Sequence, residues 1–169
     1  QPLVIWDPVF YASSGAMLSE LSSDAIHQLL QVVDILTPNL SELALLSGAS
    51  SVATDVQQPL AQTQLQQLRC RFNGDILLKG GHGDDPKRCT DLWLTGQNVS
   101  LISAPRHQSE HSRGTGCTLA SALATACALG YAREDALTIA RAYLQQGLRL
   151  SFPTGAGPGS AGTASTAGW

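Results

Sequence analysis

Short apolar runs alternate with segments of helical periodicity along the first half of the chain. The runs at 3–6, 35–37 and 75–79 predict buried strands. Apolar residues at helical spacing predict helices at 18–34 and 59–72. The side chains expected to face inward are Leu21, Ala25, Leu29, Val32 and Val33 in the first helix, and Leu60, Leu65 and Leu68 in the second. Strands alternating with helices predict an α/β protein with a largely parallel sheet.

Capping residues indicate where two helices begin or end. Ser22 or Ser23 is suited to cap the main part of the helix at 18–34. Asn39 is suited to cap a short helix that continues to Leu46 and ends at Gly48. These residues therefore predict the start of the first of these helices and both ends of the second.

The second half of the chain has a different pattern. Segments 90–94 and 99–103 flank Gly96 and Gln97, which predicts an antiparallel β-hairpin at one side of the sheet. An Ala-rich, strongly apolar helix is predicted at 115–129 and an amphipathic helix at 133–150. Residues 153–169 are rich in Gly, Ala, Ser and Thr, so we expect a flexible tail after a single domain at 1–152.

Composition narrows the class of protein. Hydrophobic residues make up 43% of the chain and charged residues 14%, which is typical of a globular protein. The net charge of -3 offers no basic surface for nucleic acid. No apolar run approaches the roughly 20 residues of a membrane helix. The four cysteines form no metal-binding pattern, and without a secretion signal we expect free thiols in a cytoplasmic protein.

The strongest local chemical signal is the segment 113–118, directly before the Ala-rich helix. Gly114 and Gly116 let the backbone turn tightly, and the helix start presents unpaired N–H groups and its positive dipole end. This arrangement suits a phosphate, and Cys117 falls in the first turn, where a thiolate is favoured. A Gly-rich turn with Cys117 as a small packing residue explains the segment about equally well.

Three further candidates follow predicted strands. Asn39 and Glu42 offer oxygen ligands that suit Mg²⁺, although a reciprocal capping box is, taken alone, the better explanation of their spacing. Lys79 ends the third strand, where α/β sheets collect ligands, or it is a solvated lysine before a turn. Asp7 ends the first strand and is either part of a metal or phosphate network or a turn residue before Pro8. Their joint placement predicts one site at the carboxyl edge of the sheet.

The order of these motifs resembles the hydroxymethylpyrimidine and phosphomethylpyrimidine kinases of thiamin synthesis, in the ribokinase-like superfamily. The resemblance runs from residue 3 to about 150 and implies a three-layer sandwich, with a mostly parallel central sheet and helices on both faces. Cys117 favours this branch, because sugar kinases of the superfamily usually have Asp there. The matching segments are Asp7-Pro8-Val9, Ser14-Gly15, Thr37-Pro38-Asn39-Leu40-Ser41-Glu42, Leu78-Lys79-Gly80-Gly81-His82 and Gly114-Thr115-Gly116-Cys117-Thr118-Leu119.

The resemblance implies a role for each candidate residue. Cys117 is expected to be the general base toward the substrate hydroxymethyl group. Gly114, Thr115 and Gly116 are expected to form an anion hole, and Lys79, Asn39 and Arg113 are expected to bind the phosphates of ATP. Glu42 and Asp7 are expected to bind Mg²⁺, and Val9 is expected to contact the pyrimidine. The expected reaction is ATP- and Mg²⁺-dependent phosphorylation of 4-amino-5-hydroxymethyl-2-methylpyrimidine and its monophosphate. The family commonly dimerises, so a homodimer is expected.

The chain departs from the family in three respects. Arg113 stands where many members have His, and Ser13 stands where many have Lys. The family's N-terminal part, with a Gly-rich substrate loop and several central strands, has no counterpart in these residues. We therefore expect half of the substrate site to be absent and an apolar sheet edge to be exposed. The alternatives are a pyridoxal kinase, which shares the fold and the cysteine base, and an inactive nucleotide-binding fragment.

Overall fold

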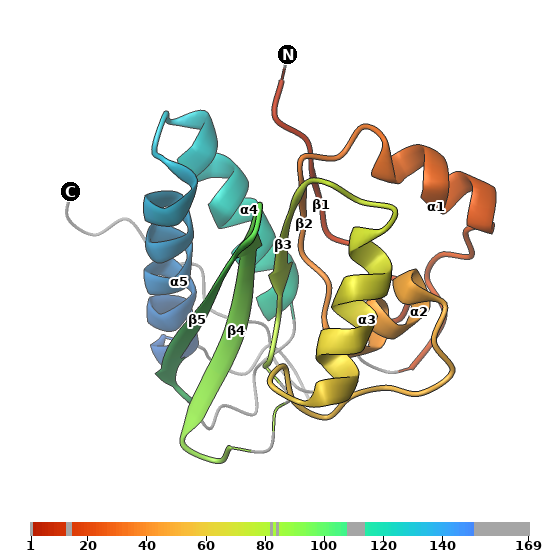
Figure 1. Cartoon of the computed structure of the whole chain (residues 1–169). Helices are drawn as coiled ribbons and strands as arrows, with labels where there is room; N and C mark the ends of the chain where they lie inside the picture. Colours follow the sequence, from red (N-terminus) through yellow and green to blue (C-terminus); the bar gives the residue numbers. More distant parts are fainter. Residues whose placement is uncertain (1, 13–14, 82, 84, 108–113, 151–169) are drawn as a thin grey trace. The chain divides into compact units, whose positions relative to one another are not determined.

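The computed structural model describes residues 2–12, 15–81, 83, 85–107 and 114–150 of the chain. They belong to two compact units, residues 1–106 and residues 107–169. The first unit contains a sheet with helices, and the second contains a pair of helices (Figure 1). The single domain predicted at 1–152 stays a prediction, and the tail predicted at 153–169 lies outside the described residues. None of the described helices is long and apolar enough to span a membrane.

The first unit is built on a mixed sheet, which has five strands within the described residues, in the order β1-β2-β3-β4-β5. The strands are β1 (Ile5–Trp6), β2 (Ile35–Leu36), β3 (Asp75–Leu78), β4 (Arg88–Thr95) and β5 (Asn98–Pro105). β1, β2 and β3 run parallel, and β3, β4 and β5 pair antiparallel. The predicted strands and hairpin are confirmed. The hairpin is longer than predicted because backbone pairing extends over its polar ends, to Arg88 opposite Pro105.

Three helices of the described first unit share a core with one face of this sheet: α1 (Ser23–Leu30), α2 (Leu40–Ser47) and α3 (Pro59–Arg69) (Figure 1). Leu36, Ile76 and Leu94 are neighbours across three strands and form the sheet's part of this core. Leu43 of α2 and Leu68 of α3 are fully buried in the same cluster. The core therefore fixes α2 next to the ends of the parallel strands.

Local capping signals determine α2. Its N-cap is Asn39, and its C-cap is Gly48 with a φ of 76°. That left-handed conformation favours glycine, which has no Cβ to clash with the backbone. The predicted helix from Asn39 to Leu46, ended by Gly48, is confirmed.

The first helix is shorter than the predicted span 18–34. It starts after Ser22, whose hydroxyl accepts a hydrogen bond from the Ala25 N–H. The Leu18 N–H instead donates to the Phe10 carbonyl, so the preceding segment is tied to the loop after β1. Val32 lies beyond the end of α1 and is 54% exposed, so its predicted inward position is wrong.

The prediction for Leu60 in α3 is also wrong. Leu60 is exposed, whereas Ala61, Leu65 and Leu68 are buried. Residues three to four apart share one helix face, and Leu60 lies off the stripe that these three residues define. The helix ends at Arg69, before the predicted end at residue 72.

The second unit consists, within the described residues, of α4 (Thr115–Ala128) and α5 (Arg133–Arg149), which pack against each other. Both helices were predicted nearly to the residue. Their buried positions are occupied mainly by leucine and alanine: Leu119, Ala120, Leu123 and Ala126 in α4, and Ala136, Leu137, Ala140 and Leu144 in α5. The start of α4 carries the Gly-rich segment.

Candidate active site

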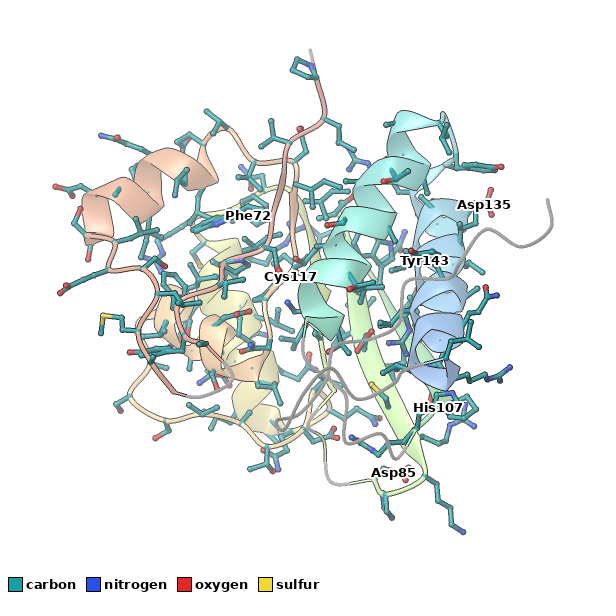
Figure 2. The ribbon with its side chains drawn as sticks, turned by 180° about the vertical axis from the view of Figure 1, so that it is seen from behind. Phe72, Asp85, His107, Cys117, Asp135 and Tyr143 are labelled. Carbon is teal, nitrogen blue, oxygen red and sulfur yellow. The ribbon has the colours of Figure 1, made fainter. Side chains whose placement is uncertain are left out.

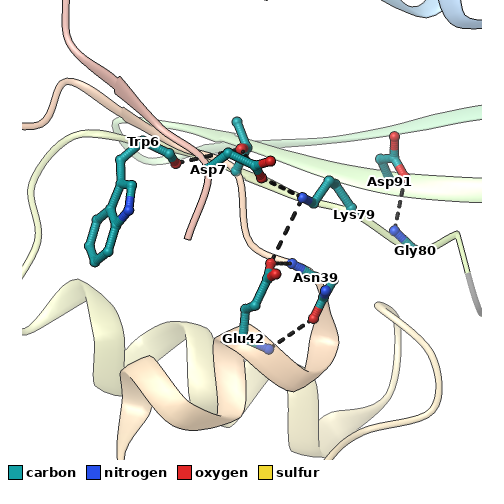
Figure 3. Close-up of polar contacts among 8 residues, drawn as sticks. Trp6, Asp7, Asn39, Glu42, Lys79, Gly80 and Asp91 are labelled. Carbon is teal, nitrogen blue, oxygen red and sulfur yellow. Dashed lines mark hydrogen bonds and ion pairs between the residues drawn. The ribbon is translucent and has the colours of Figure 1, made fainter. Parts of the chain in front are cut away.

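The segments that follow β1, β2 and β3 lie side by side at the carboxyl edge of the parallel strands (Figure 3). The Thr37 N–H donates to the Trp6 carbonyl at 3.0 Å, and the Lys79 N–H donates to the Pro38 carbonyl at 2.8 Å. A parallel bridge pairs Asn39 with Lys79. Backbone pairing thus continues past the ends of the strands. It brings together the candidate residues that the sequence places after them.

The Lys79 ammonium lies close to two carboxylates. Its Nζ is 2.7 Å from Asp7 Oδ1 and 3.8 Å from Glu42 Oε2 (Figure 3). The three side chains are only 8–15% exposed, so water screens their charges weakly. Lys79 is therefore not the solvated lysine that was the alternative explanation of this position.

Glu42 has two roles in this cluster. Its Oε2 accepts the Asn39 N–H at 2.7 Å, and its own N–H donates to Asn39 Oδ1 at 2.9 Å. The reciprocal capping box considered for this spacing is therefore present, and the same carboxylate also approaches Lys79. Burial raises the pKa of Glu42, because desolvation disfavours the charged carboxylate more than the Lys79 ammonium favours it.

Asp7 has one oxygen in use and one available. Thr37 Oγ1 donates to Asp7 Oδ1 at 3.0 Å, on the same oxygen that Lys79 contacts. Asp7 Oδ2 is buried and has no hydrogen-bond partner in the described part of the chain. A buried, unpaired carboxylate oxygen costs free energy unless a cation, water or ligand satisfies it. This oxygen is therefore available to a ligand.

The donor set fits Mg²⁺. With both carboxylates ionised, Asp7 and Glu42 outweigh the single positive charge of Lys79. Magnesium takes oxygen ligands and commonly binds through one or two carboxylates, with waters and phosphate oxygens completing its shell. The described residues contain no group of three or more His, Cys, Asp or Glu side chains that could hold a metal by itself. A Mg²⁺ ion bound here would therefore need water or phosphate oxygens in addition to the Asp7 and Glu42 carboxylates.

Val9 follows Asp7 in a tight turn. Its N–H donates to the Asp7 carbonyl at 2.9 Å, and its own carbonyl accepts the Ser19 hydroxyl at 2.9 Å. The side chain is half-buried, and its contact with a substrate stays a prediction. Arg113, predicted to bind phosphate, lies outside the described residues.

The Gly-rich segment begins α4. Gly114 is the N-cap with a φ of 75°, and a Cβ there would meet no atom within 4 Å, so backbone conformation alone favours glycine. Among the residues that the structure describes, no side chain caps this end, so the first N–H groups of the helix can bind a ligand. Cys117 is exposed on the first turn (Figure 2). Gly114, Thr115, Gly116 and Cys117 all belong to the second unit.

Two residues of the first unit were not among the predicted site residues. Thr37 is fully buried and orients Asp7, and its position directly after a strand was a usable signal. Arg106 holds the loop after Lys79, and no sequence motif marks it. Its guanidinium donates at 2.6–3.2 Å to the carbonyls of Gly81, Gly83, Asp85 and Arg88.

Comparison with known sequences identifies relatives. The profile of the phosphomethylpyrimidine kinase family matches residues 1–162. The hydroxymethylpyrimidine/phosphomethylpyrimidine kinase of Streptomyces coelicolor is 35% identical over 163 residues, which cover 94% of this chain and 57% of that protein. The thiamine biosynthesis multifunctional protein ThiED of Corynebacterium efficiens is 35% identical over 164 residues, covering 92% of this chain and 21% of that protein. The chain therefore spans between about a fifth and three fifths of these relatives.

Solved structures share the fold. The pyridoxal kinase of Staphylococcus aureus in complex with ADP gives a TM-score of 0.81 at 23% identity, covering 98% of this chain and 60% of that one. Its complex with AMP-PCP and pyridoxal gives 0.79 at 22% identity, covering 96% and 58%. This likeness confirms the predicted ribokinase-like α/β fold. With a family profile that matches nearly all of its residues, the chain belongs to the phosphomethylpyrimidine kinase family.

Proposed function

We propose that this chain acts in the ATP- and Mg²⁺-dependent phosphorylation of 4-amino-5-hydroxymethyl-2-methylpyrimidine and its monophosphate. The observation that carries the proposal is the Lys79 ammonium beside Asp7 and Glu42. Asp7 Oδ2 is buried there and has no hydrogen-bond partner among the described residues. Phosphoryl transfer depends on positioning and on neutralising phosphate charge, which this arrangement can provide. The names of the curated relatives support the choice of a pyrimidine substrate.

The strand ends would bind the phosphates of ATP. The Lys79 ammonium supplies positive charge, and the Asn39 side-chain NH₂ can donate to a phosphate oxygen while its Oδ1 remains in the helix cap. Asp7 and Glu42 would hold Mg²⁺, which when bound neutralises charge on the phosphates. Asp7 thereby gains a partner for its unsatisfied oxygen.

The start of α4 would act on the reacting groups. Cys117 takes the proton from the substrate hydroxymethyl oxygen as that oxygen attacks phosphorus. The N–H groups of Gly114, Thr115 and Gly116 stabilise the charge on the transferring phosphoryl group. Arg113, which precedes Gly114 in the sequence, would supply further positive charge, and Val9 would contact the pyrimidine ring. The uncapped helix start and the exposed thiol support these roles.

The test is ADP release by this chain with ATP, Mg²⁺ and hydroxymethylpyrimidine, followed by a coupled assay. Turnover that is lost in Cys117→Ala and retained in Cys70→Ala, a change at another exposed cysteine, supports the proposal. Absence of turnover, with ATP binding retained in calorimetry, contradicts the kinase proposal for this chain and supports a nucleotide-binding role. Absence of both contradicts the assignment of Lys79 and Asn39 to ATP.

Phosphorylation of pyridoxal is the second candidate function. The observation that favours it is the fold, because the solved structures of similar fold include pyridoxal kinases in complex with pyridoxal. Pyridoxal also presents a hydroxymethyl group on an aromatic ring, so the same base and anion hole suit it. Measuring kcat/KM for both compounds in parallel assigns the substrate.

We also infer, from the family resemblance, a cytoplasmic protein that forms a homodimer. Light scattering on the purified chain measures its mass directly. A monomer at assay concentration contradicts the dimer, and the kinase proposal does not depend on this result.

A further inference from the structure

Asp91 is a buried carboxylate next to the candidate site. It lies on β4, is 1% exposed, and its Oδ1 accepts the Gly80 N–H at 2.9 Å (Figure 3). Burying a carboxylate is costly unless hydrogen bonds compensate for the lost water. Gly80 directly follows Lys79, so Asp91 contacts the backbone next to the ammonium-bearing residue.

The register of the sheet explains this contact. β3 and β4 pair from Ile76 opposite Leu94 to Leu78 opposite Leu92, where the ladder ends. Continuing the register by one step would place Lys79 opposite Asp91. Beyond Leu78, the backbone of β3 has left the ladder, and the Asp91 side chain takes the place of the next backbone acceptor. It extends the attachment of β3 to β4 past the end of the sheet.

Gly80 has little freedom to move. A Cβ built on it would lie 1.9 Å from the Thr90 carbonyl oxygen and 3.0 Å from the Val56 side chain. The backbone at Gly80 is therefore pressed against β4 and anchored there by Asp91. On the opposite side, the Lys79 N–H is bound by the Pro38 carbonyl. Lys79 thus lies between two backbone anchors, one toward β2 and one toward β4.

We propose that Asp91 is a positioning residue for Lys79, whose hydrogen bond to the Gly80 N–H holds the Lys79 ammonium against Asp7. Only the role of Lys79 as a phosphate ligand rests on the proposed function. The contact between Asp91 and Gly80 and the position of Lys79 beside Asp7 lie within the first unit, and both can be measured without turnover. Asp91 does not contact the reacting groups in this proposal.

The test measures how fast an amine-acylating reagent modifies Lys79 in the full chain, with mass spectrometry resolving each lysine. In the wild type, the buried and paired ammonium reacts slowly. In Asp91→Ala we expect Lys79 to react roughly ten-fold faster, because the Gly80 N–H loses its buried acceptor. In Asp91→Asn the rate stays close to that of the wild type, because the amide oxygen can still accept.

The matched control is Asp75→Ala, which removes another buried aspartate from the opposite end of β3. It should leave the Lys79 rate unchanged. Equal acceleration in Asp75→Ala, or an unchanged rate in Asp91→Ala, overturns the proposal. If Asp91→Ala does not fold, amide exchange of Gly80 in the wild type decides. Strong protection supports the anchor, and exchange at the rate of an open loop contradicts it.

Calorimetric titration with ATP separates this inference from the proposed function. If the wild type binds ATP, Asp91→Ala should weaken binding about ten-fold and Asp91→Asn should restore it. If the wild type binds no ATP, the phosphate role of Lys79 fails, and with it that part of the inference. The labelling result then still decides whether Asp91 places the ammonium.

Discussion

The strand-end cluster, formed by Asp7, Glu42 and Lys79, and the start of α4 are built by different means. The cluster consists of charged side chains that are largely buried and contact each other. The start of α4 consists of backbone N–H groups and an exposed thiol. Removing a charge from the cluster leaves buried groups without partners, whereas the Cys117 side chain is exposed, so its removal leaves no buried charge behind. Substitutions in the strand-end cluster should therefore change both activity and stability. Substitution of Cys117 at the start of α4 should change activity with little effect on stability.

The largest expected effect is on turnover at the start of α4. Because we propose Cys117 as the general base, Cys117→Ala should lower kcat by roughly 100-fold or more, the usual contribution of such a group. Because the side chain is exposed, urea denaturation should show a change within about 0.5 kcal/mol. A stability loss as large as that of a core substitution would contradict this comparison. It would show that Cys117 affects both activity and stability, as expected for the strand-end cluster.

The next largest effect is on stability at the strand ends. Lys79→Met should reduce the free energy of unfolding by ~3 kcal/mol, because Asp7 and Glu42 lose their buried counter-charge. Lys87→Met, at an exposed lysine of the same unit, is the control and should change stability within about 0.5 kcal/mol. Equal values for both variants in urea denaturation would contradict the coupling argued for this cluster.

A smaller effect is expected at Gly114. Gly114→Ala should cost ~1 kcal/mol in thermal or urea unfolding, because its φ of 75° is unfavourable for a residue with a Cβ. Gly81→Ala is the control, since the added methyl group meets open space there and no positive φ opposes it. If both substitutions leave the free energy of unfolding unchanged, the positive φ of Gly114 does not limit this position to glycine.

The smallest effect is a pH dependence at Glu42. Because burial raises its pKa above the ordinary 4.5, the folded protein retains the proton to higher pH than the unfolded chain. The contribution of Glu42 to stability is therefore full below pH 4.5 and is lost as the pH rises through the folded pKa. Glu42→Gln cannot ionise and keeps an oxygen for the cap, so its stability relative to the wild type should rise over this window.

Urea denaturation at a series of pH values from about 4 to about 8 checks this prediction, because that range begins near the ordinary pKa of a glutamate and extends above a raised one. Glu20→Gln, at an exposed glutamate, is the control and should differ from the wild type by the same amount at every pH. The argument fails if the Glu42→Gln difference is equally flat. Such a result would mean that burial of this carboxylate is compensated within the strand-end cluster.

The predictions from the sequence succeeded where the determining interactions are local. α2 was predicted because Asn39 and Gly48 act within their own helix ends. The Ser22 cap of α1 was predicted for the same reason. The predicted helix before it, from residue 18, is absent because the Leu18 N–H donates to the Phe10 carbonyl, a contact that is not local to the helix. Leu60 was assigned to the core because apolarity alone does not define which stripe of α3 faces inward.

The candidate site was likewise predictable where local signals act, and it was not predictable where contacts join distant elements. The motifs placed Asp7, Asn39, Glu42 and Lys79 after strands or at a helix start, and the structure brings them together. The sequence could not reveal which oxygen of Asp7 is used, or that Arg106 holds the loop beyond Lys79. These contacts depend on side chains from distant elements, and spacing along the chain contains no such information.

The Lys79–Asp7 pair joins residues 72 positions apart. Contacts of such long sequence separation require closure of a large loop and tend to slow folding. During synthesis from the N-terminus, Asp7 and the Asn39 cap leave the ribosome well before Lys79 does. The nascent chain therefore carries an unmatched carboxylate until β3 has been made and has joined β2. The ion pair closes as the parallel part of the sheet is completed, so the geometry that we propose for phosphate binding arises only after β3 has joined the sheet.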